Sequence, residues 1–282
     1  MIKREDLRIR DPFVLTDTEN SCYYMYTSTD NVSPALSELP LGVAVYRTLD
    51  LENFEEPISV MSIDDLPDFW ADRDVWAPEV HKYRGNYYLF VSLKSADRCR
   101  GTHVFRSESP FGPFLPLSEL PLTPADWECL DGTFWQENNT PYMVFCHEWL
   151  QIKDGEICVI PLTADLSAPA GEPVVLFKAS DNPDVTSLGT KRPDCYVTDG
   201  PFLFTDTGKL KMIWSSFHRG KYLVLEAESE SGSVLGPWRH LPPRFDFDGG
   251  HAMLFERLDG QRMISLHAPN KADFERPLFL PY

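Results

Sequence analysis

Three aspartates and one histidine stand at the start of short apolar runs at widely separated points of the chain. Asp11 begins DPFVL, Asp131 begins DGTFW, Asp199 begins DGPFLF and His251 begins HAMLF. Strand formation alone does not call for a carboxylate at these points, and after Asp11 a proline also removes the next backbone donor. Carboxyl groups held close together titrate at different pH values, so one serves as a base while another keeps its proton. If the fold gathers these residues, the sequence predicts general acid–base chemistry.

The four runs belong to a segment that occurs five times. Each copy has a polar or small residue at its start, a few apolar residues, a turn rich in Gly, Asn, Asp or Arg, and a second run that alternates aromatic and aliphatic residues. The copies span residues 8–28, 77–93, 131–148, 199–216 and 250–267. Their turn residues tolerate the positive φ angles of tight hairpins. Each copy is therefore predicted to be a β-hairpin.

Five hairpins with further short strands between them predict radial repetition of small antiparallel sheets. The intervening strands include GVAVYRT, GTHVFRS, GEICVIPL and KYLVLEAES. Helical patterns are nearly absent, and the chain has 24 prolines. We expect an all-β, five-bladed β-propeller forming a single domain over residues 1–282. A β-sandwich is the alternative, but it does not require the same hairpin five times with a polar residue at the same phase.

In a propeller the innermost strands surround one axis, so equivalent positions of successive blades converge at one end of the central tunnel. Arg10 is expected beside this cluster. The converging residues are Asp11, Glu79 (two residues after the common phase), Asp131, Asp199 and His251. Burying like charges together costs several kcal/mol unless protonation or a partner relieves it. Folding alone would not select this arrangement, so it indicates a functional pocket.

The composition restricts the class of partner. The formal net charge of −17 disfavours nucleic acid and anionic membrane surfaces, and a neutral substrate fits better. No apolar run approaches the ~18 residues of a membrane span, and the opening MIKREDLRIRD is charged where a signal peptide is apolar. The six cysteines form no CxxC pair and are expected to be free thiols. We expect a cytoplasmic protein, with secretion or a periplasmic location after loss of a signal as the alternative.

Six motifs in order resemble glycoside hydrolase family 43 over essentially the whole chain: RDPFVL, WAPEV with GNYYLFVS, SESPFGPF, LDGTFW, TDGPFLF and GGHAMLF. Members of that family are five-bladed propellers that act on arabinose-, xylose- and related furanose-containing glycans. The resemblance implies an inverting exo-hydrolase that releases a terminal pentose or furanose residue from plant-type oligosaccharides. It favours an α-L-arabinofuranosidase, with β-xylosidase and β-galactofuranosidase as alternatives. It implies an oligosaccharide partner and no required cofactor.

The resemblance also implies roles for the three aspartates. Asp11 is the general base that activates water, Asp199 is the general acid, and Asp131 orients the acid and tunes its pKa. Inverting glycosidases need such carboxyls in opposite protonation states on either side of the bond. The family usually carries Glu in an EGP motif where this chain reads TDGP. Because Asp is one methylene shorter, either the backbone is advanced or the acid is weakened, and a non-catalytic carbohydrate-binding propeller is the alternative from another class.

Four further residues are expected to bind substrate. Arg10 would also keep Asp11 ionised, and Glu79 is either a substrate ligand or a partner of Arg10. Trp76 and Trp135 lie beside the phased residues, and aromatic faces stack on the C–H faces of sugars. Tryptophans also fill the interfaces between blades, and Trp76 is favoured over Trp135 for contact with substrate.

His251 is the remaining candidate. In the family the matching GH histidine lies at the floor of the pocket, so the resemblance implies a supporting role, with calcium bound through water as an option; a lone histidine is also often structural. His267 and Arg192 are further candidates for the lining of the pocket, supported only by their positions on suitable loops. Glu128-Cys129 matches the acid of fructan hydrolases superficially, but only nine residues precede Arg10, which leaves no room for the upstream nucleophile motif.

Overall fold

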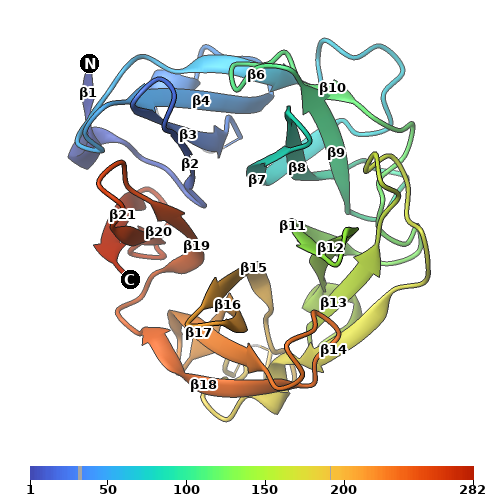
Figure 1. The fold of residues 1–282 in the computed structure, drawn as a ribbon. Helices are drawn as coiled ribbons and strands as arrows, with labels where there is room; N and C mark the ends of the chain where they lie inside the picture. The colour runs from blue at the N-terminus through green and yellow to red at the C-terminus, as the bar shows by residue number, and fades with distance from the viewer. Residues whose placement is uncertain (31–33, 191) are drawn as a thin grey trace.

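A computed structural model describes residues 1–30, 34–190 and 192–282. Five antiparallel sheets follow one another along the chain and are arranged radially around one axis (Figure 1). This confirms the prediction of an all-β, five-bladed propeller and excludes a sandwich. The innermost strands of the five blades are β2 (Phe13–Asp17), β7 (Arg73–Tyr83), β11 (Cys129–Glu137), β15 (Asp199–Asp206) and β19 (Gly250–Glu256).

The remaining strands complete each blade outward from the axis. Blade 1 adds β3 (Cys22–Ser28), β4 (Gly42–Thr48), β5 (Asn53–Phe54), β6 (Ile58–Ser62) and β1 (Ile2–Lys3). Blade 2 adds β8 (Asn86–Lys94), β9 (Gly101–Ser107) and β10 (Leu115–Pro116), and blade 3 adds β12 (Thr140–His147), β13 (Glu156–Pro161) and β14 (Val174–Lys178). Blade 4 adds β16 (Lys209–His218), β17 (Lys221–Ser229) and β18 (Trp238–Phe245), and blade 5 adds β20 (Arg262–Ala268) and β21 (Arg276–Pro281).

Helical structure is limited to short segments in the described part of the chain. These are η1 (Arg4–Asp6), η2 (Pro34–Leu36), α1 (Trp149–Ile152) and η3 (Ala179–Asp181). No helix among the described residues is long and apolar enough to cross a bilayer. All six cysteines are free.

The five predicted hairpins are the inner strand pairs of the blades. Three are closed by two-residue loops in which both residues have positive φ, as a type I′ turn requires: Arg84-Gly85, Asn138-Asn139 and Thr207-Gly208. Such turns match the twist of the flanking strands, so they fix the pairing register. The register in turn fixes which end of each inner strand lies at the site.

A backbone bulge marks the start of the inner strands. Pairing with the second strand of the blade skips two residues in blades 2 to 5, between Trp76 and Glu79, Leu130 and Thr133, Asp199 and Phe202, and Gly250 and Met253. The first skipped residue has a positive φ in each case: Ala77 (47°), Asp131 (57°), Gly200 (49°) and His251 (51°). In blade 1, Asp11 (49°) holds the same conformation just before β2. Bulges re-aim side chains, so this shared conformation turns the residue toward the axis.

The bulge corrects the predicted phase in blade 4. The left-handed position there is held by Gly200, and Asp199 stands one residue earlier, equivalent to Arg10 in blade 1. The sequence prediction treated the Asp-Gly steps at Asp131 and Asp199 as equivalent. In the structure they are offset by one residue, because the left-handed residue is the aspartate in blade 3 and the glycine in blade 4.

Buried apolar side chains of the described residues pack mainly between neighbouring blades. One cluster joins blade 3 to blade 4 and includes the fully buried Trp214, and another joins blades 4 and 5. Where the last blade meets the first, side-chain hydrogen bonds connect blades 1 and 5. Ser265 Oγ donates to the Pro12 carbonyl (2.7 Å) and Thr16 Oγ1 donates to the Glu256 carbonyl (2.5 Å).

Candidate active site

A cavity of about 450 Å³ opens at the axis, where the inner strands begin. Its size suits a small-molecule ligand. Its lining comes from all five blades: Arg10, Asp11, Trp76, Leu130, Asp131, Glu148, Trp149, Leu150, Asp199, Tyr222 and His251. The structure therefore brings together the three predicted aspartates, Arg10, Trp76 and His251.

Asp11 lies among cationic and imidazole groups. Its Oδ1 is 3.0 Å from His267 Nδ1 and 3.4 Å from His251 Nδ1. The Asp11 backbone N–H donates to His267 Nδ1 at 3.3 Å, and His267 Nε2 lies 3.3 Å from Asn270 Oδ1, which fits the tautomer with the proton on Nε2. Burial by itself raises the pKa of Asp11, but His251, His267 and Arg10 outweigh it and hold the pKa below its ordinary value. Asp11 is therefore ionised at neutral pH.

Asp131 lies deep in the cavity and is held by backbone contacts from two directions. Its own N–H donates to Ser92 Oγ (2.8 Å), and its Oδ2 accepts from the Gly200 N–H (2.9 Å). Burial raises its pKa to about 6; His251 opposes this shift and the charge of Asp11 adds to it. Its protonation is therefore coupled to that of the neighbouring carboxyls.

Asp199 is the carboxyl most prone to keep its proton. Burial raises its pKa to about 7, and the charge of Asp131 adds to the shift. The Tyr222 hydroxyl donates to Asp199 Oδ2 at 2.9 Å and opposes the shift by stabilising the ionised form. Asp11 and Asp199 thus face one cavity with their pKa values shifted in opposite directions, which is what an acid–base pair requires.

His251 connects the carboxylates. Its Nδ1 lies 3.4 Å from Asp11 Oδ1 and 3.7 Å from Asp131 Oδ2. Burial by itself lowers its pKa, but the charges of Asp11, Asp131 and Asp199 raise it above its ordinary value. The charged imidazole stabilises the ionised form of each aspartate beside it.

Gly200 explains why the bulge of blade 4 carries glycine. A Cβ built there would lie 2.9 Å from the Cγ and Cδ2 atoms of the His251 ring, and its φ of +49° is strained for other residues. The missing side chain lets the imidazole pack directly over the backbone whose N–H binds Asp131. Glycine is therefore required at position 200 by the backbone conformation and by the neighbouring imidazole, and it takes no chemical part itself.

Arg10 lines the cavity, but Glu79 does not, and the expected pairing between them does not occur. Arg10 Nη1 donates to Asn270 Oδ1 and Glu275 Oε1, both at 3.1 Å. Glu79 is buried further along the axis, where its Oε2 lies 2.8 Å from His81 Nε2. The space beside it is only about 10 Å³, which is no larger than a single water needs. Glu79 directly follows the bulge of blade 2 and lies outside the lining of the cavity, so its binding of substrate stays a prediction.

The two predicted tryptophans have different surroundings. Trp76 precedes the bulge of blade 2, lines the cavity and is 37% exposed. Trp135 lies four residues past Asp131, about 13 Å along an extended strand, and packs against the apolar cluster between blades 3 and 4. Trp135 therefore packs between blades and does not line the cavity, and its contact with substrate stays a prediction.

Several lining residues were not predicted. Tyr222 is the second residue of β17, the third strand of blade 4, and Glu148, Trp149 and Leu150 follow the second strand of blade 3. None occupies the repeated phase on which the sequence prediction depended. The sequence offered one indication of Glu148: it is a charged residue that directly follows the largely apolar run YMVFCH.

The other sequence candidates do not enter the lining. His267 is fully buried beneath Asp11, and the Arg192 guanidinium lies 4.8 Å from the centre of the Trp149 ring. In the described part of the chain, no group of three or more His, Cys, Asp or Glu side chains is placed to hold a metal ion. Calcium bound through water at His251 stays a prediction.

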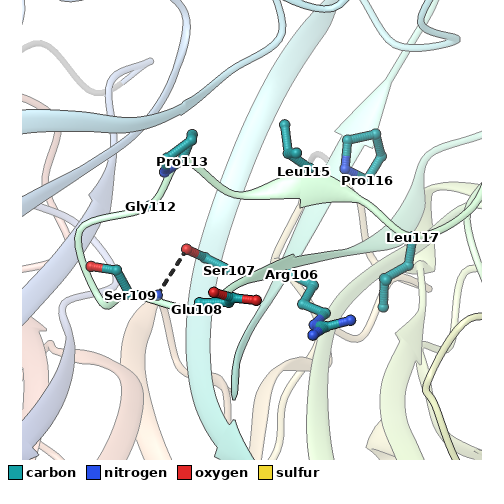
Figure 2. Close-up of a pocket in the computed structure, with 9 residues that line it drawn as sticks. All are labelled: Arg106, Ser107, Glu108, Ser109, Gly112, Pro113, Leu115, Pro116 and Leu117. Atoms are coloured by element: carbon teal, nitrogen blue, oxygen red, sulfur yellow. Dashed lines mark hydrogen bonds between the residues drawn. The ribbon is translucent and has the colours of Figure 1, made fainter. Parts of the chain in front are cut away.

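A second hollow of about 480 Å³ lies along β9 and β10 of blade 2 (Figure 2). Its lining is Arg106, Ser107, Glu108, Ser109, Gly112, Pro113, Leu115, Pro116 and Leu117. Figure 2 shows Pro113, Leu115 and Pro116 along one side and Glu108 and Arg106 along the other. None of the phased carboxyls reaches this hollow, so it lacks the acid–base groups of the axial cavity.

Fold and cavity together define a five-bladed propeller with an acidic axial pocket. The profile of the Glycosyl hydrolases family 43 matches residues 6–280, so the chain belongs to that family, as its motifs indicated. A crystal structure described as an endo-arabinase from Bacteroides thetaiotaomicron has a TM-score of 0.89 and 42% identity, covering 100% of this chain and 96% of that chain.

Two curated relatives match shorter segments. A "Xylosidase/arabinosidase" from Bacteroides ovatus is 32% identical over 81 residues, which is 27% of this chain and 24% of the relative. "Xylosidase/arabinosidase 43A" from Humicola insolens is 26% identical over 113 residues, which is 38% of this chain and 33% of the relative. The matched segments therefore span about a quarter and a third of these relatives.

Proposed function

We propose that this chain is an inverting glycoside hydrolase that releases terminal α-L-arabinofuranosyl residues from oligosaccharides. The observation that carries the proposal is the gathering of Asp11, Asp131 and Asp199 around one cavity, with the pKa of Asp11 lowered and that of Asp199 raised. Membership in the family supports the reaction class.

In the proposed reaction Asp11 is the general base. Its carboxylate, kept ionised by His251, His267 and Arg10, accepts a proton from a water molecule as that water attacks the anomeric carbon. Since attack comes from the face opposite to the leaving oxygen, the configuration inverts.

Asp199 is the proposed general acid. With a pKa raised to about 7, it retains a proton near neutral pH and donates it to the leaving glycosidic oxygen. Asp131 supports this role, since its negative charge contributes to the raised pKa of Asp199. The N–H of Gly200, the residue after Asp199, fixes the Asp131 carboxylate relative to the acid. The mechanism requires no cofactor.

The substrate assignment rests on similarity. The chain is 42% identical over its full length to the structure described as an endo-arabinase, and the two curated relatives carry names that include arabinosidase. The names of the two curated relatives include xylosidase as well, so the preference for an arabinosyl over a β-xylosyl substrate comes from the endo-arabinase structure.

Cleavage within a chain is the second candidate, because the endo-arabinase structure covers the whole of this chain at that identity. Linear arabinan separates the two modes. Arabinose as the only early product supports terminal release, whereas early accumulation of mixed oligosaccharides supports internal cleavage.

Proton NMR of the first product tests the mechanism. We expect the β-anomer to appear first from an α-linked substrate and then to mutarotate. First appearance of the α-anomer would refute inversion. Saturable binding of arabino-oligosaccharides with no turnover would assign the chain to carbohydrate binding, and turnover of aryl xylosides alone would move the substrate to xylose.

A further inference from the structure

Glu148 is a carboxylate of the cavity wall that the proposed reaction steps do not use. It directly follows β12 and is only 4% exposed, yet it lines the cavity. Among the described residues no donor lies within hydrogen-bond distance of its carboxylate, and the nearest cationic atom is Arg100 Nε at 3.7 Å. Buried carboxylates are normally hydrogen-bonded. The acceptors of Glu148 are therefore open to a ligand in the cavity.

Arg100 is a buried residue that contacts Glu148, Trp76 and Asp74. It is 4% exposed, and its Nη2 donates to Asp74 Oδ2 at 2.9 Å. Its guanidinium carbon lies 3.6 Å from the centre of the Trp76 ring, which is a stacked cation–π contact. Its Nε and Nη1 find no hydrogen-bond partner within the described part of the chain. One guanidinium thus places Glu148 and Trp76 relative to each other.

Trp76 offers one free face beside Glu148. Arg100 covers the other face, and the Nε1–H donates to Asp30 Oδ2 (3.3 Å), which fixes the plane of the ring. The side chain is 37% exposed and lines the same cavity. An apolar ring face beside an unpartnered carboxylate matches a sugar, which has C–H groups on one side and hydroxyl donors at its edge.

The position of Glu148 in the ring determines which side of the substrate it meets. Glu148 belongs to blade 3, which neighbours blade 4 with Asp199, whereas Asp11 lies in blade 1 (Figure 1). Asp199 is close enough for its charge to contribute to the raised pKa of Glu148. Because the proposed acid Asp199 acts on the leaving oxygen, we place Glu148 on the leaving-group side.

We propose that Glu148, held by Arg100 beside Trp76, accepts hydrogen bonds from hydroxyl groups of the leaving sugar and makes the enzyme selective for substrates whose leaving group is a sugar. This inference rests on the proposed hydrolysis and identifies a specificity-determining residue for it. Arg100 is a positioning residue, because its unpartnered nitrogens are sealed from the cavity.

The test compares two leaving groups in each variant. An arabinobioside has hydroxyls on the leaving sugar, whereas a nitrophenyl arabinofuranoside has none. For Glu148→Ala we expect the ratio of the two kcat/KM values, arabinobioside over aryl glycoside, to fall by about ten- to hundred-fold, since hydrogen bonds to a charged group are lost. Glu148→Gln keeps one acceptor and the volume, and its ratio should fall less.

Glu226→Gln is the matched control. Glu226 is similarly buried (6% exposed) and pairs with Lys211 at 2.9 Å in blade 4, but it does not line the cavity. Its variant measures the effect of removing a buried charge on folding and should leave the substrate ratio unchanged.

The outcomes separate this inference from the proposed function. Equal losses on both substrates in Glu148→Gln, with a displaced pH profile, would assign Glu148 to proton transfer and overturn the inference. An unchanged ratio in a folded Glu148→Ala protein would also overturn it. If the unmodified protein hydrolyses neither substrate, the proposed function fails instead.

Discussion

The hydrogen bond from Tyr222 to Asp199 gives a sharp test of the acid assignment. In Tyr222→Phe the hydroxyl that donates to Asp199 Oδ2 at 2.9 Å is removed, and the ring that stacks on His267 is kept. The bond stabilises the ionised carboxylate more than the protonated carboxyl. Its loss therefore raises the pKa of Asp199 further above about 7.

The size of the shift follows from the two protonation states. A hydrogen bond to a charged group contributes about 1.5–3 kcal/mol and one to a neutral group about 0.5–1.5 kcal/mol. The difference is roughly 1–1.5 kcal/mol, and about 1.4 kcal/mol corresponds to one pKa unit. We therefore expect the pKa of Asp199 to rise by about one unit.

The assay is the pH dependence of kcat/KM on an arabino-oligosaccharide, because this ratio reports the free enzyme. A general acid is active while protonated, so activity falls as pH rises through its pKa. The alkaline limb should therefore move upward in Tyr222→Phe.

Tyr26→Phe is the control for this variant. It removes a hydroxyl that donates to the Pro110 carbonyl at 2.8 Å, away from the cavity, so it should reduce stability without moving the limb. An alkaline limb that stays in place or moves downward in Tyr222→Phe would refute the assignment of Asp199 as the acid.

Three further variants test the other groups. Asp199→Asn should lower kcat on oligosaccharides by about 10²–10⁴-fold and much less on aryl glycosides with good leaving groups, and equal losses on both would contradict an acid role. Asp11→Asn should abolish turnover of both substrate types, since each needs activated water; retained aryl glycoside activity would show that another base operates. Gly200→Ala places a Cβ 2.9 Å from the His251 ring, so denaturant unfolding should show a loss of about 1–3 kcal/mol, together with reduced kcat; an unchanged midpoint would show that the imidazole moves aside at no cost.

The fold could be predicted because its signals are local and repeated. A hairpin needs only alternating apolar residues and a turn that accepts positive φ, as Asn138-Asn139 and Thr207-Gly208 do. Repetition of that unit then allowed Asp11, Asp131 and His251 to be placed together, although they lie far apart along the chain.

The remaining site residues depend on geometry that the repeat does not encode. Trp135 and Glu79 were expected in the cavity because they lie near the phase, but a few residues along an extended strand carry a side chain out of reach. Tyr222 and Glu148 come from outside the inner strands, where no common position marks them. Their roles depend on neighbours across blades, which a single sequence does not display.

The junction between the first and last blades has a consequence for how the protein would lose activity. There the ring is held by side chains, and the imidazoles of blade 5 that meet Asp11 are part of that hold. The contacts that close the ring therefore include the imidazoles around the proposed base. On heating, we expect activity to be lost when blades 1 and 5 separate, while the strands within each sheet are still paired.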